Sequence, residues 1–150
     1  MCTSKSARRG FTLVEILIVV IILGILAAIV VPQFANASTD AKTTSLRTSL
    51  NNVRNQIEVF KCQHNESAPA LAGMWTLLTG ASDTTEANSA APTGTHWGPY
   101  LQAAPANPLN SLTGVSSAES DPNAGWYYQP VGLGFTFYSR NADGSVNRTY

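Results

Sequence analysis

The sequence is poor in charge and in cysteine, and both shortages exclude broad classes of protein. Charged residues make up only 12% of the 150 residues, about half the usual share in a soluble domain. Nine basic side chains balance nine acidic ones, whereas a protein that binds nucleic acid through its phosphates carries an excess of positive charge. We therefore expect no nucleic-acid partner. Two cysteines, Cys2 and Cys62, are too few for a disulfide-rich scaffold or a four-cysteine zinc site.

The motifs of common enzymes are missing as well. His64 and His96 are the only two histidines in the sequence, and their spacing does not fit a metal site. No arrangement of serine, histidine and aspartate, and no pair of catalytic carboxylates, can be argued from the spacing. The sequence therefore predicts a protein that is not an enzyme.

A long apolar run over residues 11–31 is the strongest feature that is present. Its 21 residues contain one charge, Glu15, and one hydroxyl group, Thr12. As a helix the run is about 32 Å long, and the hydrocarbon core of a bilayer is about 30 Å thick, so the run can span a membrane. Three basic residues precede it: Lys5, Arg8 and Arg9. Because basic residues stay on the cytoplasmic side, we expect a cytoplasmic N-terminus and a chain that continues outside the cytoplasm.

Two familiar kinds of N-terminus account for only part of this pattern. A secretory signal peptide agrees with the basic start and with the small-residue segment 35–37, Ala-Asn-Ala. Its apolar region, however, is about 7–15 residues long, which is shorter than the run over residues 11–31. A plain membrane anchor accounts for the length and leaves Glu15 unexplained, because a carboxylate within a membrane span is costly.

A third interpretation begins with segment 10–15, Gly-Phe-Thr-Leu-Val-Glu, which ends the basic leader and opens the apolar run. This segment resembles the type IV prepilin N-terminus, which type IV pilins and type II secretion pseudopilins share. The resemblance extends over about residues 5–34 and includes Gly24, Pro32 and Phe34.

The resemblance implies that the chain is processed and then polymerises. A prepilin peptidase cuts after Gly10, removes the leader 1–10 and methylates the new amino group of Phe11. Before assembly, helix 11–31 lies in the inner membrane. After assembly, it forms part of the core of a helical filament. An unpaired buried charge is costly, so we expect Glu15 of one subunit to pair with the Phe11 amine of the next and to set the axial register.

Gly24 and Pro32 carry two interpretations that the sequence leaves open. Proline inside a helix removes one backbone hydrogen bond, and glycine lowers helix propensity by about 1 kcal/mol relative to alanine. Segment 25–31 between them is therefore the easiest part of the helix to unwind, and in filaments of pilin-like proteins this segment is often extended. The alternative is a membrane helix that tolerates both residues.

Beyond the apolar run, segment 32–64 is predicted to continue the helix with one apolar face. The apolar residues recur at helical spacing: Leu46, Leu50, Val53, Ile57 and Phe60. We expect the helix to reach about Cys62, which would be a half-buried thiol. A head formed by residues 65–150 should cover the apolar stripe.

The head is predicted to combine a short helix with a small antiparallel sheet. The expected elements are a helix near residues 71–78, a long loop over 79–96, strands at 125–131 and 133–139 with a turn at Gly132, and a last short strand within 145–150. The fold class is therefore α+β and pilin-like, with a long N-terminal helix packed on a small C-terminal antiparallel sheet.

The head also resembles the major pseudopilin of type II secretion, a family that commonly holds a calcium ion in its C-terminal loops. The resemblance lies in three segments: Trp97–Leu101, Pro105–Pro108 and Phe137–Gly144. Asp121, Asn141 and Asp143 are the oxygen donors of suitable type. Their sequences also form ordinary turns. We favour the turns and expect no cofactor, with calcium as the alternative.

These features together predict a structural subunit of a type II secretion pseudopilus, a periplasmic filament that supports protein export. The resemblance implies its partners: copies of itself, the prepilin peptidase, an inner-membrane assembly platform with its ATPase, minor pseudopilins and membrane lipid. It also implies one pass through the inner membrane, with the head in the periplasm. Two alternatives stay open. One is a type IV pilin of a surface pilus for adhesion, motility or DNA uptake, and the other is a membrane-anchored binding or enzymatic domain that does not polymerise and has no need of Glu15.

Overall fold

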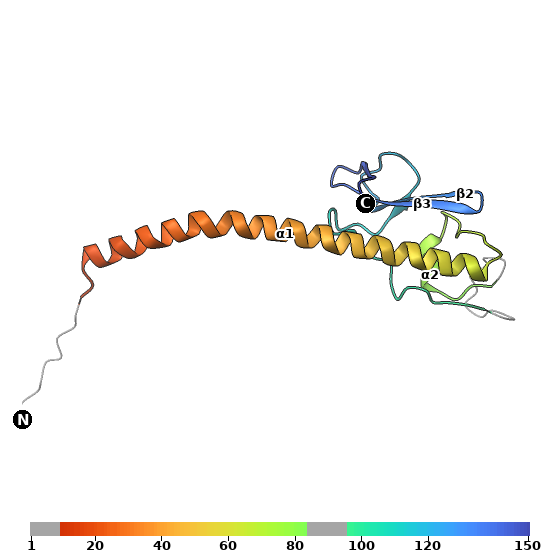
Figure 1. Cartoon of the computed structure of the whole chain (residues 1–150), viewed down its shortest axis with the longest axis horizontal. Coiled ribbons are helices and arrows are strands. Elements are labelled where there is room, and N and C mark those ends of the chain that lie inside the picture. The colour runs from red at the N-terminus through yellow and green to blue at the C-terminus, as the bar shows by residue number, and fades with distance from the viewer. Residues whose placement is uncertain (1–9, 84–95) are drawn as a thin grey trace, which may run out of the picture. The chain divides into compact units, whose positions relative to one another are not determined.

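The computed structural model describes residues 10–83 and 96–150, which form two helices and four strands (Figure 1). The elements are α1 (Leu13–Gln63), α2 (Met74–Thr79), β1 (Val115–Ser116), β2 (Trp126–Val131), β3 (Gly134–Arg140) and β4 (Val146–Asn147). Residues 1–9 of the predicted leader and residues 84–95 of the predicted loop lie outside the described residues. The chain divides into an N-terminal unit (Met1–Asp40) and a head unit (Ala41–Tyr150), and each unit is described by itself.

Helix α1 is 51 residues long and confirms the predicted long helix, which was expected to end near Cys62. The helix is continuous through Gly24 and Pro32. Glu15 lies in its first turn and Lys61 in its last turn, which is the placement of charge that the helix dipole favours.

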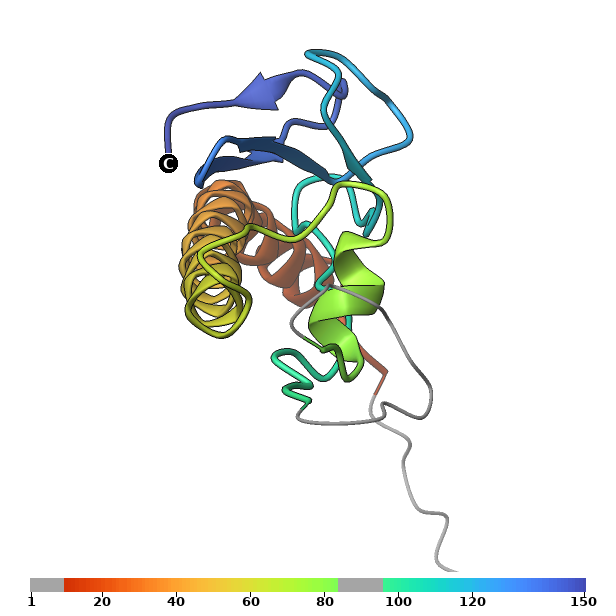
Figure 2. The same cartoon turned by 90° about the vertical axis from the view of Figure 1, so that its right-hand side faces the viewer.

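The core of the head unit is built on the apolar stripe of α1. All five predicted stripe residues are at most 1% exposed: Leu46, Leu50, Val53, Ile57 and Phe60. They form one apolar cluster with side chains of α2, β2 and β3, among them Leu78, Trp126 and Phe137. Figure 2 shows the sheet over one side of this part of α1 and α2 beside it. The prediction that a head covers the stripe is therefore confirmed.

Cys62 departs from the sequence expectation, because its side chain is exposed and not half-buried. It follows the buried Phe60 by two residues. Successive helical residues are rotated by about 100°, so Cys62 points away from the stripe.

The four strands form one sheet in the order β1-β2-β3-β4. Strands β2 and β3 pair antiparallel from Trp126↔Ser139 to Val131↔Gly134, and Gly132 in the turn between them has φ 56°, a conformation that glycine adopts without strain. The β2–β3 hairpin and the short β4, which pairs antiparallel with β3, were predicted from the alternating apolar residues and the turn residues.

Strand β1 corrects the prediction of a purely antiparallel sheet. Val115 and Ser116 pair parallel with Trp126 and Tyr127, so the sheet is mixed. The N–H groups of Gly125 and Trp126 both donate to the Gly114 carbonyl, at 2.9 and 3.0 Å, and this contact holds the loop that returns the chain to β2. A two-residue strand has no periodic pattern in the sequence, so it can be predicted only where a turn marks it, as the turn over residues 141–144 marks β4.

A buried asparagine joins the loop before the sheet to the sheet itself. Asn107, within the Pro-x-Asn-Pro segment, is completely buried. Its side-chain amide donates to the carbonyl groups of Gly125 and Arg140, each at 2.7 Å. Its Oδ1 atom accepts from the Leu109 N–H at 2.9 Å. The turn-rich segment therefore has a structural purpose, since it fixes the ends of β2 and β3.

Candidate functional site

The start of α1 is a capping box made by Thr12 and Glu15. The Thr12 N–H and hydroxyl groups donate to Glu15 Oε2 at 2.9 and 2.8 Å, and the Glu15 N–H donates to the Thr12 hydroxyl oxygen at 3.2 Å. Thr12 is thus the N-cap residue, and Glu15 satisfies the N–H group of the cap in return. Glu15 Oε1 accepts no bond from the described residues, so one carboxylate oxygen stays available at the helix start.

This arrangement adds a second reason for a carboxylate at position 15. From the sequence, Glu15 was expected to pair with a neighbouring subunit, and Thr12 was noted only as the one hydroxyl group of the apolar run. The pattern Thr-x-x-Glu before an apolar run is a known signal for a capping box, so Thr12 could have been recognised from the sequence.

Gly10 and Phe11, the residues of the predicted cleavage point, precede the helix and are exposed. A side-chain carbon built at Gly10 meets no atom within 4 Å. The chain itself therefore imposes no demand for glycine at this position. If glycine is required there, the requirement belongs to a partner that binds the extended segment.

The surface that follows the helix start is apolar on every side. Every large apolar side chain from Phe11 to Phe34 is at least 42% exposed. A helix that is apolar all round is stable when buried in a protein core or a membrane, not in water. Among the described residues α1 is the one helix that is long and apolar enough to cross a membrane.

Gly24 and Pro32 lie within this apolar segment and do not break the helix. A side-chain carbon at Gly24 meets nothing within 4 Å apart from the backbone of its own helix. Proline at position 32 removes the N–H group that would bond to the Ala28 carbonyl. The helix of the single subunit therefore continues through both residues. Whether segment 25–31 unwinds in a filament stays a prediction.

The three calcium candidates lie in two loops that touch, and one oxygen atom of each accepts a local hydrogen bond. The Asp121 N–H donates to the Gly144 carbonyl at 3.2 Å. Asp121 Oδ1 accepts from the Asn123 N–H at 2.9 Å, and Asp143 Oδ1 accepts from the N–H and hydroxyl groups of Ser145 at 2.9 and 2.6 Å. Each carboxylate therefore closes its own turn.

The charges of these carboxylates follow from the same contacts. The Asn123 N–H, the Ser116 hydroxyl and the nearby Arg140 lower the pKa of Asp121. The hydroxyl and N–H groups of Ser145 lower the pKa of Asp143. Asn141 Oδ1 accepts from the Asn147 side chain at 2.9 Å. Among residues 10–83 and 96–150, no three His, Cys, Asp or Glu side chains come together as a metal-binding group. Calcium binding stays an open alternative from the sequence.

Two further polar residues in the head, His64 and Arg140, were given no structural role from the sequence. The His64 ring is buried and stacks on Phe60, with Nδ1 2.8 Å from the Phe60 carbonyl and Nε2 3.0 Å from the Ser82 hydroxyl. Arg140 is also completely buried. His64 had been considered only as a metal ligand, and Arg140 had no role of its own within segment 137–144.

Comparison with known proteins agrees with the resemblance found in the N-terminal segment. Residues 5–31 match the model of the prokaryotic N-terminal methylation motif. The type IV major fimbrial protein FimA of Dichelobacter nodosus is 37% identical over 93 residues, which are 60% of this chain and 59% of that protein. The type II secretion system core protein G of Pseudomonas aeruginosa is 40% identical over 57 residues, 38% of this chain and 40% of that protein. The chain is thus similar to type IV pilin-like proteins and has their N-terminal motif.

A third relative matches a larger part of the chain. The type II secretion system core protein G of Klebsiella pneumoniae is 28% identical over 106 residues, 69% of this chain and 71% of that protein. The chain spans between 46% and 59% of the length of the three FimA proteins that it matches. No solved structure matches it.

The names of these relatives bear on the class of function. They are fimbrial proteins and core proteins of a secretion system. This agrees with the prediction from the sequence that the chain is a structural subunit and not an enzyme. The relatives include both fimbrial proteins and core proteins of type II secretion, so they do not separate a surface pilus from a pseudopilus.

Proposed function

We propose that the chain is a subunit of a type II secretion pseudopilus, polymerised through residues 11 to about 35. The observation that carries this proposal is the start of α1, where a capped carboxylate is followed by a helix with apolar side chains on all sides. Such a surface needs a membrane before assembly and other helices after it. The relatives named as core protein G support the secretion branch.

Processing is the first step of the proposed function. The prepilin peptidase cuts between Gly10 and Phe11, which are exposed and lie before the helix, and methylates the new amine. That amine then lies close in sequence to Glu15. In a staggered bundle of helices, the free carboxylate oxygen of Glu15 accepts the Phe11 amine of a neighbour, and the opposite charges offset the cost of burying each.

The proposed partners follow from these steps. They are copies of the same chain, the peptidase, the inner-membrane platform with its ATPase, minor pseudopilins and lipid. The N-terminus is cytoplasmic before cleavage, because Lys5, Arg8 and Arg9 precede the span, and the head lies in the periplasm.

A surface pilus is the second candidate, and the FimA relatives favour it. Deleting the gene distinguishes the two branches. Loss of exported proteins from the medium, with unchanged surface filaments, supports the pseudopilus. Loss of surface filaments or of twitching motility, with unchanged export, supports the pilus.

The cleavage step has its own test, a replacement of Gly10 by Phe. Since the fold leaves open space at this position, the variant should insert and fold normally. It should nonetheless stay in the membrane as a precursor that keeps its leader. Mass spectrometry of the purified chain reads the result directly. A mature chain that starts at Ser38 would support a signal peptide and would contradict the filament proposal.

A further inference from the structure

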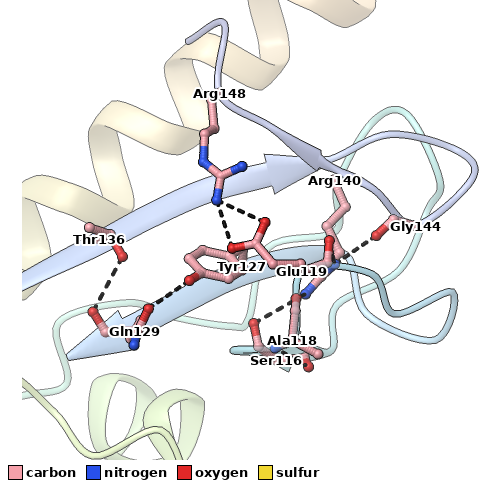
Figure 3. A network of polar contacts seen from close by, with 9 residues as sticks. All are labelled: Ser116, Ala118, Glu119, Tyr127, Gln129, Thr136, Arg140, Gly144 and Arg148. Carbon is pink, nitrogen blue, oxygen red and sulfur yellow. Dashed lines mark hydrogen bonds and ion pairs between the residues drawn. The ribbon is translucent and has the colours of Figure 1, made fainter. Parts of the chain in front are cut away.

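A buried cation lies among backbone carbonyl groups at the end of β3. The Arg140 side chain is completely inaccessible to solvent. Its guanidinium group donates to five carbonyl oxygens, those of Ser116, Ala118, Glu119, Trp126 and Gly144. The distance is 2.6 Å to Gly144 and 3.3 Å to both Ser116 and Trp126. Figure 3 shows the side chain between the segment that carries Ser116 and Ala118 and the turn that carries Gly144.

The partners of this cation are main-chain dipoles and not carboxylates. Among residues 10–83 and 96–150, Arg140 forms no ion pair. The Glu119 carboxylate binds the exposed Arg148 instead, at 2.7 and 2.8 Å (Figure 3). Burial lowers the pKa of the Arg140 guanidinium, whereas the charges of Asp121 and Glu119 raise it, and an arginine stays protonated in such surroundings. A buried charge must be compensated, and here carbonyl oxygens do so.

The guanidinium group joins two loops that are in close contact. One loop follows β1, and the other is the turn between β3 and β4. Ser120 and Ser145 form a β-bridge between them, and a side-chain carbon at Gly144 would lie 2.8 Å from the backbone of Asp121. Because the two backbones meet so closely, their carbonyl groups can converge on one charge.

We propose that the Arg140 guanidinium takes the place that a bound calcium ion would have in these loops, so that the head folds without a metal. A calcium ion needs about 6–8 oxygen ligands. The carbonyl oxygens that converge here face a cation that the chain itself supplies. A second cation beside it would be repelled, and the Oδ1 atoms of Asp121 and Asp143 already accept hydrogen bonds within their turns. The calcium ion implied by the pseudopilin resemblance is therefore not expected in this chain.

The first arm of the test uses the unaltered full chain in detergent. Trp75, Trp97 and Trp126 all belong to the head unit, so tryptophan fluorescence follows the melting of the head alone. We expect the same melting temperature with excess calcium chloride and with the chelator EGTA. A rise in calcium and a matching fall in EGTA would overturn the proposal, because a ligand that binds the folded state raises its stability.

The second arm compares two arginines that touch the same loop. Arg140→Met removes the buried guanidinium and keeps most of the volume, and we expect a fall in melting temperature of roughly 10 °C or more. Arg148→Met removes an exposed partner of Glu119, and we expect a change of at most about 3 °C. Arg140→Lys keeps the charge but has fewer donors in a different geometry, so it should lie between them. Equal melting of Arg140→Met and Arg148→Met would contradict the proposal.

A rescue experiment shows whether the cation itself matters. Methylguanidinium at millimolar concentration should raise the melting temperature of Arg140→Ala and leave that of Arg148→Ala unchanged. An equal response of both variants would mean that no specific cation site exists. If Arg140→Ala does not fold at all, the calcium and EGTA arm on the unaltered chain decides the question by itself.

Discussion

The N-terminal unit and the head unit are stabilised in opposite ways. In the N-terminal unit the large apolar side chains are exposed, and Thr12 and Glu15 form a hydrogen-bonded capping box. In the head unit the apolar stripe of α1 is buried, and polar groups such as Asn107 and Arg140 are buried with their partners. The head is therefore specified by contacts within one chain. The exposed apolar side chains of the N-terminal unit need surroundings that a single chain does not provide. Such surroundings are a membrane or other helices.

This contrast predicts which property each substitution changes. Changes in the N-terminal unit should alter insertion or assembly and leave the melting of the head unchanged. Changes in the core of the head should alter melting first. Tryptophan fluorescence of the full chain, together with the yield of sheared filaments, measures both effects on the same variant.

The largest effect is expected from Glu15, and the capping box allows its two roles to be separated. Glu15→Gln keeps an oxygen that accepts from Thr12 but removes the charge. Glu15→Leu removes both. If the charge pairs with a neighbour's amine, both variants should insert, be cleaved and fail to build filaments, because the buried amine loses its counter-charge. A membrane-fraction blot beside the filament assay records the three steps.

The matched control for Glu15 is Thr12. Thr12→Ala removes the cap and keeps the carboxylate, at a cost of about 0.5–2 kcal/mol to the helix, so its filament yield should fall far less than that of Glu15→Gln. Normal filaments from Glu15→Gln and poor filaments from Thr12→Ala would show that Glu15 acts only as a helix cap. The argument for intermolecular pairing would then be lost.

The next largest effect is expected in the core of the head. Val53 is 1% exposed, and Val53→Asp buries an unpaired carboxylate, which costs several kcal/mol against a total stability of about 5–15 kcal/mol. The head should unfold or melt far below the unaltered chain. Val59, six positions further along the same helix, is 44% exposed, so Val59→Asp should change the melting temperature little. Equal melting of the two variants would show that the stripe is not covered by the head.

The sequence predicted the elements whose patterns are periodic. The apolar run and the stripe from Leu46 to Phe60 indicated α1, and the alternation on either side of Gly132 indicated the β2–β3 hairpin. Strand β1 has only two residues, so no period could reveal it. Its parallel pairing depends on a backbone contact with Gly114, and backbone contacts leave no mark in the pattern of side chains.

The candidate sites show the same limit. Glu15 was found because a charge inside an apolar run is conspicuous, and Thr12 could have been found with it as a capping box. Arg140 could not be found in this way, since all five of its hydrogen-bond partners are backbone carbonyl groups. The partners of an arginine that binds carboxylates can be recognised in the sequence as acidic residues. Carbonyl groups belong to every residue, so the sequence does not show which of them bind an arginine.

The smallest effect is expected at Gly24, where it tests the two interpretations of segment 25–31. A side-chain carbon at Gly24 has open space in the subunit, so Gly24→Ala should leave the melting of the head unchanged and favour the helix by about 1 kcal/mol. If the segment unwinds on assembly, the additional ~1 kcal/mol of helix stability in Gly24→Ala opposes the unwinding. Filament yield should then fall by a factor of about five. Ala28→Gly is the matched reverse change, which makes unwinding easier and should not lower the yield. A lower filament yield for Ala28→Gly, with an unchanged yield for Gly24→Ala, would show that the segment assembles as a helix. In a filament that keeps the helix, an added glycine lowers helix stability, whereas the replacement of a glycine by alanine does not.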